Sequence, residues 1–126
     1  MSTMLLNGQP DPELKAAMDE SLRRIQEIHA RIKADRVAGE AALHRLMPIA
    51  RRDTGQSRSV ALFLLGLYNG FRFPFDLYEL RGLDYEVMED CLAVLRMDAN
   101  ALKEVHLYFE NGSTVFETLA MKWRAA

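Results

Sequence analysis

The sequence predicts an all-α fold, a compact bundle of five to six mostly short helices with a longer N-terminal amphipathic helix. Apolar residues recur at three- and four-residue steps along most of the chain, the period of a helix with one buried face. No segment of strand length alternates polar and apolar residues between turn signals. With 126 residues, of which 49% are hydrophobic and 27% charged, a single core is able to form without a metal ion or a disulfide.

The N-terminal amphipathic helix is predicted over residues 11–37, after a flexible tail at residues 1–10. Asp11 is placed to cap it, and Pro12 suits the first helical position because its missing N–H would be unpaired there. A regular apolar stripe follows, made of Leu14, Met18, Leu22, Ile25, Ile28 and Ile32. Met18, Ile25 and Ile32 lie seven residues apart, as in a coiled coil. The stripe therefore either packs on its own domain or pairs with a partner, including a homodimer through residues 14–32.

A helical domain is predicted over residues 38–124, beginning at a hinge at Ala38-Gly39. In the helix that follows, Pro48 predicts a kink or break near Met47, because proline removes a backbone hydrogen bond and collides with the preceding turn.

The next helix is apolar on all sides from Val60 to Tyr68, which is typical of a central, covered helix. Thr54 or Ser57 is placed to cap it. Gly66 lowers helix propensity, so its presence predicts a close helix crossing.

An aromatic loop and three further helices are predicted for the rest of the chain. The loop at residues 71–83 includes a short helical turn at residues 76–81, and Asp84 caps the next helix. The inner face of that helix is predicted to be Val87, Met88, Cys91, Leu92 and Leu95. Asp98 to Asn100 opens a helix whose inward residues are Leu102, Val105 and Phe109, and Thr114 with Glu117 forms the capping box of the last helix.

The sequence contains no recognisable catalytic, cofactor-binding or metal-binding set. A single cysteine, Cys91, excludes an intrachain disulfide and a cysteine-based zinc cluster. The three histidines lack helical zinc spacing, and no glycine-rich phosphate loop is found. We therefore expect a protein that is not an enzyme and uses no cofactor.

The N-terminus lacks the basic start and long apolar stretch of a signal peptide, and the longest apolar run covers about half of a bilayer core. We expect a cytoplasmic protein without membrane contact.

One candidate partner-binding surface combines aromatic and acidic residues. Residues 59–126 carry 6 basic and 10 acidic side chains. The candidate anchor is Phe71, Arg72, Phe73 and Phe75, and the candidate acidic patch is Asp76, Glu79, Asp84, Glu86, Glu89 and Asp90. Such a patch is suited to steering a basic partner, although it also fits a solvated face. The rings either plug the bundle or anchor a partner, and different rings can do each.

An alternative surface is a cluster of Arg45, Arg51, Arg52 and Arg58, which could contact the phosphates of a nucleic acid. The apolar helix after Thr54 does not suit a DNA groove. Nucleic acid is therefore the second choice of partner.

Several segments resemble a known family. They are Asp53–Arg58, Leu64–Gly70, Arg72–Leu77, Leu80–Asp84, Cys91–Asp98, Glu104–His106 and Tyr108–Gly112. Together they resemble a family of short uncharacterised proteins, a domain of unknown function, encoded on plasmids, prophages and integrative elements of proteobacteria. The resemblance covers about residues 38–124.

The resemblance implies a mobile-element setting and supplies no catalytic residue. Small non-catalytic proteins of such elements often block host proteins. The leading hypothesis is therefore a non-enzymatic protein-interaction module that occludes a basic surface of a host or element-encoded protein. An inhibitor of a bacterial defence complex, similar to anti-CRISPR proteins, is one such role. The alternative is a plasmid or phage accessory regulator that contacts nucleic acid through the arginine cluster.

Overall fold

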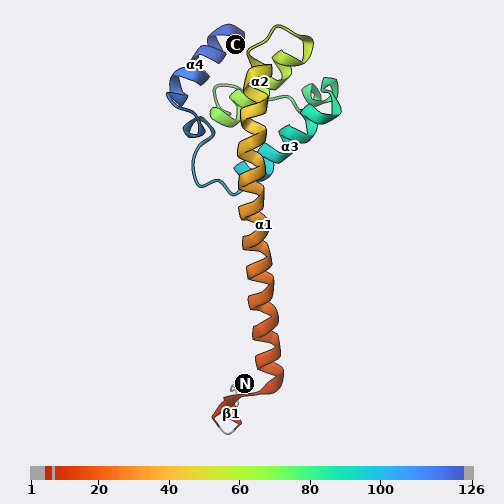
Figure 1. Ribbon diagram of the computed structural model, residues 1–126, viewed down its shortest axis with the longest axis vertical. Helices are drawn as coiled ribbons and strands as arrows, with labels where there is room; N and C mark the ends of the chain where they lie inside the picture. Colours follow the sequence, from red (N-terminus) through yellow and green to blue (C-terminus); the bar gives the residue numbers. More distant parts are fainter. Residues whose placement is uncertain (1–4, 7, 124–126) are drawn as a thin grey trace. The chain divides into compact units, whose positions relative to one another are not determined.

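The computed structural model describes residues 5–6 and 8–123 and confirms the all-α class (Figure 1). Its elements in chain order are β1 (Leu5–Leu6), β2 (Gln9–Pro10), α1 (Pro12–Ala50), α2 (Gly55–Tyr68), the 3-10 helix η1 (Leu77–Gly82), α3 (Tyr85–Ala99), the 3-10 helix η2 (Val105–Tyr108) and α4 (Gly112–Trp123). The two-residue strands β1 and β2 pair antiparallel within the predicted tail. Residues 1–4 and 7 of that tail lie outside the described residues.

Contacts divide the chain into two compact units, Met1–Lys33 (unit 1) and Ala34–Ala126 (unit 2). The boundary lies inside α1, so the last turns of that helix belong to unit 2. Among the described residues, no helix has both the length and the apolar character needed to cross a membrane.

The predicted hinge at Ala38-Gly39 is wrong, and so is a break near Met47, because α1 continues through both to Ala50. A kink near Met47 stays a prediction. Gly39 is buried against Met97, so this glycine serves close packing within unit 2. Pro48 is exposed and stands in the last turn, so α1 ends at Ala50, two residues after it.

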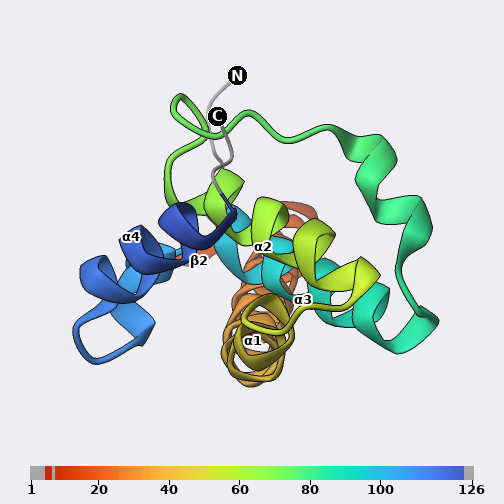
Figure 2. The ribbon, with the colours of Figure 1, turned by 90° about the horizontal axis from the view of Figure 1, so that it is seen from above.

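The core of unit 2 is built around α2, which contacts α3, α4, η1 and η2, with α3 and α4 flanking it in Figure 2. The last turns of α1 add Ala42, Leu43, Leu46, Met47 and Ala50 to this core. Thr54 is the N-cap residue of α2, one of the two predicted positions, and its backbone N–H donates to Ser57 Oγ at 3.2 Å. Gly66 does not mark a helix crossing. A Cβ there would lie 3.1 Å from Phe75 Cβ, so the glycine accommodates the following loop.

The inner face of α3 is shifted from the prediction. Val87 and Cys91 are buried as expected, but Val94 and Met97 complete the face and Leu95 is exposed. Three- and four-residue steps allow either choice, and contact with α1 favours Met97 because Gly39 makes room for it.

The predicted helix that opens at Asp98 does not form. Asp98 belongs to α3, the short η2 is the only helical segment between α3 and α4, and Leu102 is exposed instead of buried. The last helix begins at Gly112, whose Cα lies too close to the His106 carbonyl for any side chain. The Thr114–Glu117 capping box is therefore wrong, since both residues already lie inside α4.

Candidate functional site

Unit 2 carries an apolar groove of about 220 Å³ between α2, the loop after it, η1 and α3. Figure 2 shows that loop leaving the end of α2 and arching across to η1 before the chain returns as α3. The lining residues are Phe63, Gly66, Leu67, Gly70, Phe73, Phe75, Leu77, Leu80 and Leu95. We call this hollow the α2 groove. Leu77 and Leu95 expose apolar side chains at it.

The three phenylalanines of the predicted anchor have different roles. Phe73 is only 8% exposed and belongs to the core, whereas Phe71 is 97% exposed. Phe75 is half-buried, with its ring edge-on to Phe63 at a centroid distance of 5.7 Å. Phe73 and Phe75 therefore plug the bundle, and Phe71 is free to contact a partner.

The loop that presents Phe71 is held by Arg72. Its guanidinium donates hydrogen bonds of 2.6 and 3.0 Å to the Glu117 carboxylate on α4, and its Cζ atom lies over the Phe73 ring, 4.6 Å from the ring centroid. Tyr68 at the end of α2 donates its hydroxyl to the same carboxylate at 2.7 Å. The two residues that follow Phe71 in the sequence, Arg72 and Phe73, are therefore held in place, one by hydrogen bonds and one by burial.

These contacts shift the titration of Glu117. The hydrogen bonds from Arg72 first, and from Tyr68 second, lower the pKa of the Glu117 carboxyl to about 2. The same carboxylate raises the pKa of the Tyr68 hydroxyl. The sequence offered no sign of this role, because Arg72 and Glu117 are 45 residues apart and Glu117 also suits a capping box.

The acidic patch and the arginine cluster, predicted as alternative surfaces, form two ion pairs with each other. Arg45 binds Asp90 through hydrogen bonds of 2.8 and 3.1 Å, and Arg58 binds Glu79 at 3.3 Å. Glu79 also accepts a hydrogen bond of 2.8 Å from the Ser59 hydroxyl. The charges of these four residues are therefore compensated within unit 2.

The other acidic residues differ in their environment. Asp76 caps η1 by accepting the Tyr78 N–H at 2.9 Å. Asp84 precedes α3 as predicted, but its carboxylate accepts from Gln56 at 3.0 Å instead of capping the helix. Glu86 and Glu89 are exposed and form no ion pair among the described residues.

Of the arginine cluster, Arg51 and Arg52 remain exposed and form no ion pair within residues 5–6 and 8–123. They lie at the turn between α1 and α2. Surface ion pairs open readily, so phosphate contact by this cluster stays a prediction.

The groups with reactive chemistry lie elsewhere. Cys91 is fully buried, and burial raises the pKa of its thiol to about 12. Nδ1 of His106 is buried without a hydrogen-bond partner in the described part of the chain, beside the Tyr68 ring. Within that part, no three His, Cys, Asp or Glu side chains are grouped to hold a metal ion.

The fold and the α2 groove define a small all-α protein whose loop between α2 and η1 lines an apolar hollow and exposes an aromatic side chain. The chain belongs to a family of unknown function, DUF7673, whose model matches residues 40–124. No curated protein and no solved structure matches the chain. The predicted membership of a family of unknown function is thus confirmed. The mobile-element setting stays a prediction.

Proposed function

We propose that the chain is a non-enzymatic protein-interaction module that binds a basic partner protein through the α2 groove. The observation that carries this proposal is Phe71, which is almost fully exposed between two groove residues, Gly70 and Phe73. Exposed aromatic side chains beside an apolar hollow mark interaction sites, and such anchors supply much of the binding energy. The Arg72–Glu117 contact preorganises the loop, which lowers the entropic cost of binding.

The chemistry of the partner follows from α3. This helix contributes Leu95 to the groove and carries Glu86 and Glu89, both exposed. Glu86 and Glu89 precede Leu95 by about two turns and lie on other faces of α3, so a partner that extends from the groove around this helix would meet their negative charge. Lysine or arginine next to an apolar segment is the complementary surface.

A narrower form of the proposal rests on the family resemblance. In it the protein acts in the bacterial cytoplasm on behalf of a mobile element, and its partner is a defence complex whose basic surface it occludes, as anti-CRISPR proteins do. We expect its expression to restore plaque formation in cells that carry an active defence system. The Phe71→Ser variant should not restore it. Equal protection by both chains would exclude the α2 groove as the inhibitory surface.

Affinity capture from a bacterial lysate tests the general proposal. The tagged full-length chain is compared with Phe71→Ser and with Leu102→Ser, which removes another exposed apolar side chain, 75% exposed, outside the groove. We expect a basic protein that the parent chain and Leu102→Ser retain and Phe71→Ser loses. Identical protein sets from all three chains would overturn the assignment.

The charge requirement has its own test with the purified partner. Glu86→Lys combined with Glu89→Lys should slow association and reduce its dependence on salt. The matched control combines Glu104→Lys with Glu110→Lys, two exposed carboxylates outside the groove. If the control slows association equally, net charge and not the face of α3 attracts the partner.

A further inference from the structure

The part of α1 in unit 1 leaves its apolar stripe uncovered. Between Pro12 and Lys33 no side chain is buried. The four central members of the stripe, Met18, Leu22, Ile25 and Ile28, are 48–56% exposed. The stripe extends from Leu14 to Ile32, a length of about 27 Å at the rise of an α-helix. An apolar face of this length on a water-exposed helix is typical of a helix that packs against another surface.

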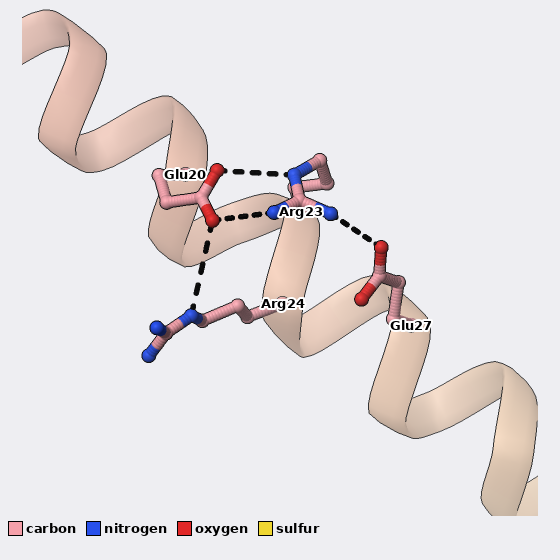
Figure 3. Close-up of polar contacts among 4 residues, drawn as sticks. All are labelled: Glu20, Arg23, Arg24 and Glu27. Atoms are coloured by element: carbon pink, nitrogen blue, oxygen red, sulfur yellow. Dashed lines mark hydrogen bonds and ion pairs between the residues drawn. The ribbon is translucent and has the colours of Figure 1, made fainter.

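The opposite face of the same helix is satisfied by its own charges. Arg23 donates to both Glu20 and Glu27, and Arg24 lies 3.9 Å from the Glu20 carboxylate (Figure 3). These contacts at three- and four-residue spacing stabilise the helix and keep the face opposite the apolar stripe in water. Unit 1 therefore offers one face for association, the apolar stripe.

Ser21 interrupts the stripe and leaves room for a side chain from outside. A surface hollow of about 350 Å³ is lined there by Ala17, Met18, Ser21 and Leu22. In a coiled coil each core side chain inserts between four residues of the facing helix. The hollow at Ser21 has such a lining and would accept a branched aliphatic side chain.

We propose that unit 1 associates with a second copy of this chain as an antiparallel two-helix coiled coil over residues 14–32. In the register that aligns the whole stripe, Leu14 faces Ile32 of the second copy and Met18 faces Ile28 of the second copy. Ile25 of the second copy enters the hollow at Ser21, so the gap in one helix is filled by the other. The arrangement is two-fold symmetric, and every contact occurs twice.

Charge complementarity selects this orientation. One side of α1 borders the apolar stripe next to Ile28. This side carries Glu13 and Glu20 in the first half of the stripe's length and Arg24 and Arg31 in the second half. Reversing one helix places Arg31 near Glu13 of the second copy. Arg24 likewise approaches Glu20 of the second copy. The two Arg24 side chains meet near the two-fold axis of the dimer, and these Glu20 carboxylates compensate for their repulsion.

A parallel dimer would instead oppose like charges. Core heptads in that arrangement bring Arg31 against Arg36 of the second copy, and they leave Arg24 opposite His29 of the second copy without a carboxylate partner. It would also stack Ser21 on Ser21 of the second copy, leaving both hollows unfilled. The antiparallel register avoids both problems.

The mass of the full-length chain in solution tests whether the dimer forms. Sedimentation equilibrium should give twice the 14.4 kDa of one chain. Ile25→Glu places two charges in the interface and should weaken association at least about 100-fold. Ala30→Glu adds the same charge to the far side of the helix and should leave the dimer intact. A monomeric parent chain, or a dimer that survives Ile25→Glu, would refute the proposal.

Trp123, the only tryptophan, lies in α4 and reports on unit 2. An unchanged unfolding transition of Ile25→Glu, followed by its fluorescence, shows that loss of the dimer is not loss of the fold.

Disulfide formation tests the orientation, since the native Cys91 is buried and only introduced thiols are accessible. A mixture of Met18→Cys chains with Ile28→Cys chains should yield the mixed disulfide, because these positions face each other in the antiparallel register. Met18→Cys on its own should cross-link poorly. The reverse result would establish a parallel pair and overturn the register. Either outcome leaves the α2 groove unaffected, because its residues belong to unit 2.

Discussion

The guanidinium of Arg45 on α1 holds the carboxylate of Asp90 on α3 through two hydrogen bonds of 2.8 and 3.1 Å. The Asp90 side chain is the less exposed of the two. The pair therefore connects the last turns of α1 to α3. In the sequence analysis, Arg45 belongs to the arginine cluster and Asp90 to the acidic patch, the two surfaces predicted as alternative binding sites.

This pair predicts that Asp90 is structural, unlike Glu86 and Glu89. Asp90→Lys should lower the melting temperature because it opposes two cations, whereas Glu86→Lys and Glu89→Lys should change it little. Combining Asp90→Lys with Arg45→Glu should recover part of the loss. Thermal unfolding of the single and double variants measures the coupling. Additive losses in the double variant would mean that the contact contributes nothing in solution.

Gly39 on α1 predicts a large cost for one added methyl group. A Cβ at this position would lie 2.3 Å from Met97 Cβ and 3.0 Å from the Ala93 carbonyl oxygen. Gly39→Ala should therefore destabilise unit 2 by about 1–3 kcal/mol, in spite of the better helix propensity of alanine. Urea unfolding followed by Trp123 fluorescence measures the change.

The matched control for that substitution is Gly55→Ala. Gly55 begins α2 and has no atom within 4 Å of the added Cβ. We expect this variant to be as stable as the parent or slightly more stable. Equal effects at both glycines would show that α1 and α3 separate easily to admit a side chain.

The Arg72–Glu117 contact predicts a stability that depends on acid pH. The folded-state pKa of Glu117 is about 2, below the ordinary value of 4.5, so the contact stabilises the fold fully above pH 4.5. That contribution is lost as the pH falls from 4.5 toward 2. Glu117→Gln lacks the titrating group, and its stability should fall less across this window. If the stability of both chains fell equally between pH 4.5 and pH 2, the lowered pKa of Glu117 would be contradicted.

Cys91 is predicted to be inert until the chain unfolds. Burial raises its thiol pKa from 9.0 to about 12, so the thiolate is scarce near neutral pH and the sulfur is also covered. A thiol reagent should modify the native chain far more slowly than the chain in denaturant. Above pH 9 the unfolded state ionises first, and stability should decline up to the folded-state pKa. Rapid labelling of the native chain at pH 8 would show that α3 opens.

Several elements were predictable because their signals are local. The short η1 begins after Asp76 and ends at Gly82, where the sequence predicted a helical turn. Asp84 precedes α3, also as predicted. The apolar run from Val60 to Tyr68 correctly predicted a central α2, since few of its side chains could face water. Capping and composition act within a few residues, and their signals can be read directly.

Other elements failed where a distant segment overrode a local signal. Gly39 looked like a hinge, but contact with Met97 keeps α1 helical through it. Leu102 had the spacing of a core residue, yet the chain between α3 and α4 forms only the short η2 and leaves Leu102 exposed. Helical periodicity states which residues share a face and not which segments meet.

The candidate site shows the same division. The sequence placed aromatic and charged residues near one another, and it left open whether the rings turn inward or outward. The fold separates buried Phe73 from exposed Phe71, and it adds Glu117, a partner for Arg72 that no motif indicated.

The sequence by itself determined the helical class, the amphipathic stripe of α1 and the buried position of Cys91, because each follows from short-range spacing of apolar residues. Only the tertiary structure decided that Arg45 neutralises Asp90 and that Arg72 binds Glu117. Each of these pairs spans 45 residues, and its formation depends on how whole helices pack. The charges left at the surface, and with them any partner, are therefore a property of the packed chain.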